Sequence, residues 1–195
     1  MEKKEMLNLI KEEGRIARRF FVMNSFDGIL TVLGVLLAMY FFQQEDSRFV
    51  ILSCMAPALA LMVSGIWSAY SIEKVERAKE LDKIEEKMLR NLEGTKIGER
   101  LNLLVIMDSI INGISPLIVS LIIISPFALS LLQVIEIQTA FHTAFTLAGV
   151  LLFGLGAFIG QIGEKNKTLT GLIMLVVGLL VVALLYVLNS SLRGV

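Results

Sequence analysis

Apolar residues gather into five long runs along this chain, separated by short polar segments. The hydrocarbon core of a bilayer is about 30 Å thick, so a helix needs about 20 mostly apolar residues to cross it. No run shows the alternation of apolar and polar residues that is typical of a membrane barrel strand. The pattern predicts an all-α integral membrane protein with five transmembrane helices. The predicted spans are approximately 20–42, 49–70, 101–125, 141–162 and 169–188.

Composition supports this prediction and excludes several functions. Of 195 residues, 55% are hydrophobic and the mean hydropathy is +0.75, which is above the range of soluble domains. The 18 basic and 18 acidic residues cancel, so no bulk charge points to nucleic acid as a partner. Cys54 is the only cysteine and His142 the only histidine, which excludes disulfides within the chain and Cys/His zinc sites.

The distribution of basic residues predicts the orientation in the membrane. Lysines and arginines concentrate before the first span, between the second and third, and between the fourth and fifth. By the positive-inside rule the N-terminus is cytoplasmic and the C-terminus external or lumenal. The pattern does not distinguish a plasma membrane from an organellar one.

Two polar segments are expected to be helical. Residues 1–19 either lie along the cytoplasmic surface as an amphipathic helix or serve only to orient the first span. Residues 71–100 are rich in Glu, Lys, Leu and Ala, so 72–92 should continue the second span as a cytoplasmic helix ending near Gly94. Pro126 is expected to mark the outer end of the third span. The resulting segments are 1–19, 20–70, 71–100 and 101–195.

Asp27 and Asp108 interrupt the first and third apolar runs. A carboxylate at bilayer depth costs a few kcal/mol, so it usually faces a cavity or a partner and is a candidate for function. For Asp27 the alternative is a later start of the span, with Ser25 or Asp27 capping its first turn. For Asp108 the alternative is a hydrogen bond between helices.

Three carboxylates, Glu73, Glu76 and Glu80, share one face of the expected cytoplasmic helix. Together they offer the hard oxygen ligands that divalent cations prefer. The alternative is a set of ordinary ion pairs on a solvated helix, such as Glu73 with Arg77. In the fourth span, Gly156 and Gly160 have the GxxxG spacing that favours close helix contact, within one chain or across a dimer.

The order of several short motifs resembles the vacuolar iron transporter family, which includes nodulin-like and yeast vacuolar manganese/iron carriers. "SFDGILT" resembles that family's Asn-Asp-Gly-Leu-Val-Thr signature in span one, and "LMVSGIWSAYS" resembles its Met-Ala-Ala-Gly-Glu-Tyr signature in span two. "EGRIARRF" and the closing pair of spans are also similar to the family pattern. The resemblance covers nearly the whole chain.

The resemblance implies that Asp27 and Met62 line a metal pathway at a homodimer interface. It also implies that Glu73, Glu76 and Glu80 belong to a cytoplasmic metal-collecting domain. Two departures qualify this: Ile66 stands where the family has a glutamate, and the segment between spans two and three is too short for the full cytoplasmic domain. We expect Asp108 to supply the lost charge.

The sequence therefore predicts a homodimeric transporter that moves Fe²⁺ or Mn²⁺ out of the cytoplasm, with proton exchange as the plausible energy source. No permanently bound cofactor is expected, and no nucleotide-binding motif suggests use of ATP. The alternative is a membrane scaffold or assembly protein that kept the fold and lost the ion route. An enzyme is the third possibility, and no nucleophile and base are evident in the sequence.

Overall fold

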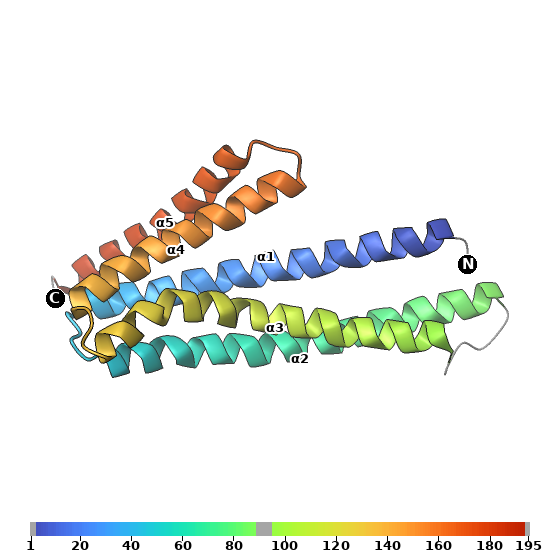
Figure 1. Ribbon diagram of the computed structural model, residues 1–195, viewed down its shortest axis with the longest axis horizontal. Helices are drawn as coiled ribbons and strands as arrows, with labels where there is room; N and C mark the ends of the chain where they lie inside the picture. The colour runs from blue at the N-terminus through green and yellow to red at the C-terminus, as the bar shows by residue number, and fades with distance from the viewer. Residues whose placement is uncertain (1–2, 89–94, 194–195) are drawn as a thin grey trace. The chain divides into compact units, whose positions relative to one another are not determined.

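The computed structural model describes residues 3–88 and 95–193, and every regular element in this part of the chain is an α-helix (Figure 1). Each helix contains a stretch long and apolar enough to cross a membrane, as predicted. The all-helical prediction is therefore confirmed for the described residues. The helices are α1 (Lys3–Phe41), α2 (Ser47–Met88), α3 (Lys96–Leu131), α4 (Ile137–Ile162) and α5 (Lys167–Arg193).

The helices extend beyond the apolar runs that predicted them. Helix α1 includes the polar segment before the first run without interruption. Ser25 and Asp27 therefore lie inside a helix, and the alternative in which either one caps its start is wrong. Helix α2 continues past the second run to Met88, as expected from the helix-favouring composition of residues 72–92. The expected helix end at Gly94 lies outside the described residues.

Pro126 does not end the third span, which corrects the prediction. Helix α3 continues to Leu131, with Pro126 in its interior. A proline in a helix removes the N–H that would bond the carbonyl four residues earlier, here the carbonyl of Ile122. The hydroxyl of Ser125 donates to that carbonyl oxygen at 2.8 Å. The neighbouring serine therefore replaces the lost bond and lets the helix continue.

The contacts divide the chain into two compact units. Unit 1 comprises Met1–Asn24 and Leu61–Ser115. Unit 2 comprises Ser25–Ala60 and Pro116–Val195. The boundaries fall inside α1, α2 and α3, so each of these helices contributes to both units.

Unit 2 contains the hydrophobic core. Helices α1 to α4 contribute fully buried side chains to it, including Ile29, Cys54, Phe127 and Phe141. The rings of Phe127 and Phe141 pack edge to face with their centroids 4.9 Å apart, a favourable arrangement for aromatic pairs. This core joins segments that are distant in the sequence.

Glycines bring α4 and α5 together in unit 2, where the two helices lie side by side (Figure 1). A Cβ atom added to Gly156 would lie 2.5 Å from the carbonyl oxygen of Thr170 and 2.7 Å from the Cα atom of Gly171. Only residues without a side chain allow backbones to approach this closely. The GxxxG pair of the fourth span therefore makes a contact within the chain.

Three short turns in unit 2 share one geometry. Gln43, Gln133 and Glu164 follow the ends of α1, α3 and α4 with φ of 52°, 58° and 53°, in the left-handed region. After α3, the Gln133 N–H donates to the Ser130 carbonyl at 3.0 Å and the Val134 N–H to the Leu129 carbonyl at 3.1 Å. This is the Schellman pattern, which satisfies the last carbonyls of a helix.

Candidate functional site

Buried polar side chains gather in unit 1, between the parts of α2 and α3 that belong to it. Glu73 on α2 and Asp108, Ser109 and Asn112 on α3 are all buried. Buried carboxylates are costly unless a charge or hydrogen bonds compensate them, so their surroundings decide what they can do. We call the cluster of Glu73, Arg77 and Asp108 the charged triad.

A guanidinium joins the two carboxylates of the charged triad. Arg77 Nε lies 3.5 Å from Glu73 Oε2, and Arg77 Nη2 lies 3.7 Å from Asp108 Oδ2. The three side chains are only 11%, 6% and 4% exposed for Arg77, Glu73 and Asp108 respectively. Because Asp108 is on α3, the ion pairs of the charged triad connect α2 and α3 at a position that is largely shielded from solvent.

An amide layer lies one helical turn along α3 from Asp108. The side-chain amide of Asn112 donates to the main-chain carbonyl of Gly65 on α2 at 2.7 Å. Its carbonyl oxygen accepts a hydrogen bond from Asn24 Nδ2 on α1, whose amide also donates to the Phe20 carbonyl at 3.0 Å. Asn112 therefore ties all three helices of unit 1 together through hydrogen bonds.

Two glycines set the spacing between α2 and α3 beside this layer. A Cβ atom on Gly113 would lie 2.5 Å from the carbonyl oxygen of Met62, and one on Gly65 would lie 3.1 Å from the Cα atom of Gly113. The backbones are thus in direct contact at this level. This close approach fixes which residues of α2 and α3 face each other, and so places Asp108 beside Arg77.

The structure places the predicted metal-binding residues in different environments. Asp27 is exposed on α1, Glu76 is exposed on α2, and Met62 is half-buried. Glu73 and Asp108 are both buried and share Arg77. The side chain of the sixth predicted residue, Glu80, lies outside the described residues.

Sequence reasoning found one half of the charged triad. The spacing of Glu73 and Arg77 favours an ion pair on one helix, and that alternative is confirmed. It missed the contact from Arg77 to Asp108, because that contact depends on the register between α2 and α3. The hydrogen bond expected of Asp108 as an alternative is replaced by this ion pair.

Among the side chains that the structure describes, no three Asp, Glu, His or Cys residues come together to hold one metal ion. Two carboxylates, Glu73 and Asp108, approach the same cationic group. A divalent cation bound there would therefore need further oxygen ligands, such as water or carbonyl groups.

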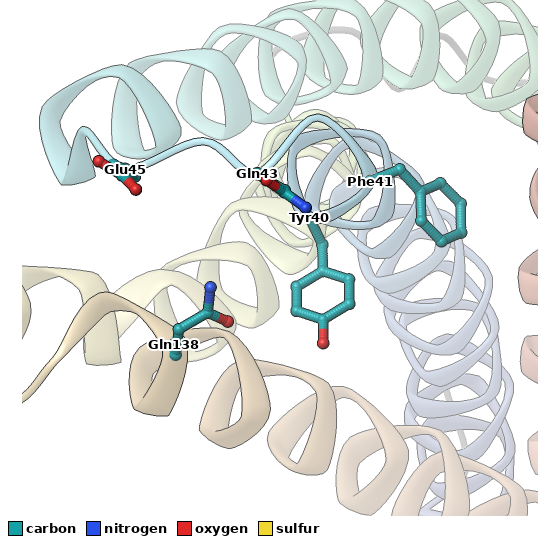
Figure 2. Close-up of a pocket in the computed structure, with 5 residues that line it drawn as sticks. All are labelled: Tyr40, Phe41, Gln43, Glu45 and Gln138. Carbon is teal, nitrogen blue, oxygen red and sulfur yellow. The ribbon is translucent and has the colours of Figure 1, made fainter. Parts of the chain in front are cut away.

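Unit 2 contains a separate pocket of about 300 Å³ where α1 ends and α4 begins. Figure 2 shows that Gln138 extends from α4 toward the ring of Tyr40, while Phe41 points away. Gln43 and Glu45, from the turn after α1, complete the lining. A single carboxylate is a weak basis for binding a metal ion, so the buried polar groups of unit 1 remain the candidate site.

Comparison with known proteins identifies a relative over nearly the whole chain. No protein-family model matches the sequence, and no solved structure matches it. The chain is 30% identical over 185 residues to Uncharacterized protein MJ0645 of Methanocaldococcus jannaschii, in an alignment that covers 93% of this chain and 92% of that protein. The chain therefore belongs to the same family as this archaeal protein.

Proposed function

We propose that this protein is a multi-pass membrane transporter that moves a divalent transition metal, Fe²⁺ or Mn²⁺, out of the cytoplasm. The observation that carries the proposal is the pair of buried carboxylates, Glu73 and Asp108, on facing helices of a strongly apolar chain. Ionisable groups held inside membrane helices typically mark ion pathways.

The charge distribution supports an orientation for this transport. The basic residues in the N-terminal part of α1, the C-terminal part of α2 and the start of α3 favour a cytoplasmic N-terminus and an external or lumenal C-terminus. In this orientation the charged triad lies near the cytoplasmic end of the spans. Cations leaving the cytoplasm would meet it first, and protons returning through the same carboxylates would supply the energy.

Asp27 supports a homodimer as the working form. It is exposed in the single chain although it lies within an apolar run of α1. A carboxylate facing lipid is unfavourable, and a second copy of the chain would cover it. The resemblance to the iron carriers favours the same arrangement, with Asp27 and Met62 lining the metal route.

Transport by the purified full chain in vesicles tests the proposal. We expect Mn²⁺ added outside to quench a dye trapped inside vesicles that contain the wild-type protein, and Asp108→Asn to slow this quenching at least about tenfold. Asp82→Asn removes an exposed carboxylate from the C-terminal part of α2 and should leave the rate unchanged. Gel filtration of each variant confirms that it is folded.

A membrane scaffold is the second candidate, favoured by the absence of a three-ligand metal cluster among the described side chains. It predicts no metal movement by the wild-type protein in the same vesicles. Growth of cells that express the chain or Asp27→Ala, in toxic Fe²⁺, Mn²⁺, Zn²⁺ or Co²⁺, would extend the comparison. Protection by the wild type alone supports transport and identifies the metal.

A further inference from the structure

Arg77 occupies the position of a bound cation in the charged triad. Its guanidinium approaches one carboxylate from α2 and one from α3, at 3.5 Å and 3.7 Å. Charge-assisted hydrogen bonds between such groups are typically about 2.8 Å long. Both separations are longer than this, so these two contacts are ion pairs rather than hydrogen bonds.

The hydrogen bonding of Asp108 also suggests that this position can take a ligand. Its Oδ2 atom is buried and accepts no hydrogen bond from the described residues, although the side chain is only 4% exposed. Buried carboxylate oxygens usually have a hydrogen-bond donor or a metal as partner. The atom lies beside Arg77, so a cation entering there would find an available ligand.

The charges of the site favour a divalent ion. Glu73 and Asp108 together carry two negative charges, and Arg77 compensates one of them. Arg19 attracts the carboxylate of Glu73 and Glu76 repels it, so these two additional charges act in opposite directions. When Arg77 withdraws, the two carboxylates match the charge of one divalent cation, and their hard oxygens suit Mn²⁺ better than soft metals.

The side-chain amide of Asn112 is not available as a ligand for this ion. Both polar ends of the Asn112 side chain are engaged, one with Gly65 and the other with Asn24. The remaining ligands would be water molecules, as is common for hard divalent cations.

We infer that Glu73 and Asp108 form a divalent-cation site in which Arg77 is a tethered counter-ion that the metal must displace. This inference deepens the proposed function and rests on it for its biological role. While Arg77 fills the site, only a fraction of the molecules can bind metal. The apparent Kd is therefore raised in proportion, because affinity scales with the fraction in the competent state.

Calorimetry with Mn²⁺ and the purified full chain in detergent tests this inference. Arg77→Gln should lower the Kd for Mn²⁺ about tenfold or more, because the competent state becomes dominant. Adding Asp108→Asn to Arg77→Gln should abolish the gain. Lys79→Gln is the control, because it removes an exposed positive charge from the same helix. Solvent screens that charge, so the variant should change the Kd less than about twofold.

Arg77→Lys provides a second variant if Arg77→Gln does not fold. A lysine keeps the charge but lacks the planar fork that reaches two carboxylates, so it should be displaced more readily and lower the Kd by about threefold. An unchanged or higher Kd in the folded Arg77 variants would overturn the inference. Excess Na⁺ should not displace Mn²⁺ from Arg77→Gln, and displacement would overturn the divalent preference.

The two proposals fail separately. If wild-type vesicles transport Mn²⁺ while folded Arg77 variants bind it no more tightly, the tethered counter-ion is wrong and the transporter stands. If Arg77→Gln binds Mn²⁺ tightly but no variant or wild type transports it, the cation site stands and the transporter is wrong.

Discussion

Gly28 lies directly against Pro116, bringing α1 and α3 into backbone contact within unit 2. A Cβ atom added to Gly28 would lie 2.8 Å from both the Cα atom and the carbonyl oxygen of Pro116. Neither partner can yield easily, because both are backbone atoms and Pro116 is fully buried. The contact is therefore possible only with glycine at position 28.

Gly28→Ala should destabilise the protein by about 1–3 kcal/mol, the usual cost of overpacking a filled interior. Gly154→Ala is the matched control, because an added Cβ there meets nothing within 4 Å. That control should be neutral or slightly stabilising, since alanine favours a helix more than glycine does. Denaturant unfolding in detergent measures both, and equal stability of the two variants would contradict the close contact.

Asn24 and Asn112 should show a favourable coupling in a double-mutant cycle. Their side chains share a hydrogen bond between α1 and α3, and such bonds between membrane helices typically contribute about 0.6 kcal/mol, with a maximum of about 1.7. Asn112→Ala should also cost more than Asn24→Ala, because its second bond joins α3 to α2 at the Gly65 carbonyl, whereas the second bond of Asn24 stays within α1. Strict additivity of the two alanine variants, measured by unfolding, would exclude the shared bond.

Ser125→Ala should cost about 1 kcal/mol, because the Ile122 carbonyl loses the hydroxyl that replaces the missing N–H of Pro126. Restoring that N–H with Pro126→Ala should compensate, so the double variant should be at least as stable as Ser125→Ala alone. Thermal unfolding of the two single variants and the double variant checks the relation. A double variant less stable than Ser125→Ala would argue against this account of α3.

The turn after α3 offers a stabilising substitution. Gln133 has φ of 58°, a conformation that costs residues with a side chain about 1–2 kcal/mol but is free for glycine. Gln133→Gly should therefore raise the free energy of unfolding by about 1 kcal/mol, less the greater freedom of glycine in the unfolded chain. Gln133→Ala keeps the Cβ atom and should bring no such gain. Thermal midpoints of the two variants decide the matter.

The proposed membrane orientation predicts opposite labelling at two turns. In a Cys54→Ala background, Glu45→Cys after α1 should react with an impermeant maleimide in intact cells. Glu164→Cys after α4 should react only once the membrane is permeabilised. Both positions are exposed in the structure, so access alone does not separate them. The reverse labelling pattern would show that the N-terminus is external.

The fold was largely predictable because long apolar runs admit few structures. Runs of that length predicted the five helices, and charge-rich helix formers correctly predicted that α2 continues beyond its apolar part. The prediction for Pro126 was wrong because proline alone suggests a helix end. The compensating hydroxyl of Ser125 can be recognised only once the helix geometry is known.

The candidate site was predictable only in its components. Glu73, Arg77 and Asp108 each stand out in the sequence, and helical spacing alone pairs the first two. The link to Asp108 depends on how α2 and α3 align, which is set by the backbone contact at Gly65 and Gly113. The spacing of residues along the sequence does not predict that alignment, because it does not show that Gly65 and Gly113 face each other.

The turn between α4 and α5 is closed by bonds among neighbours, with the Lys165 N–H donating to the Gly160 carbonyl at 2.8 Å. The helices it joins then pack through residues that are close in the sequence. Structure that depends on such local contacts forms quickly. This hairpin should therefore be able to form as a unit before it packs against the preceding helices.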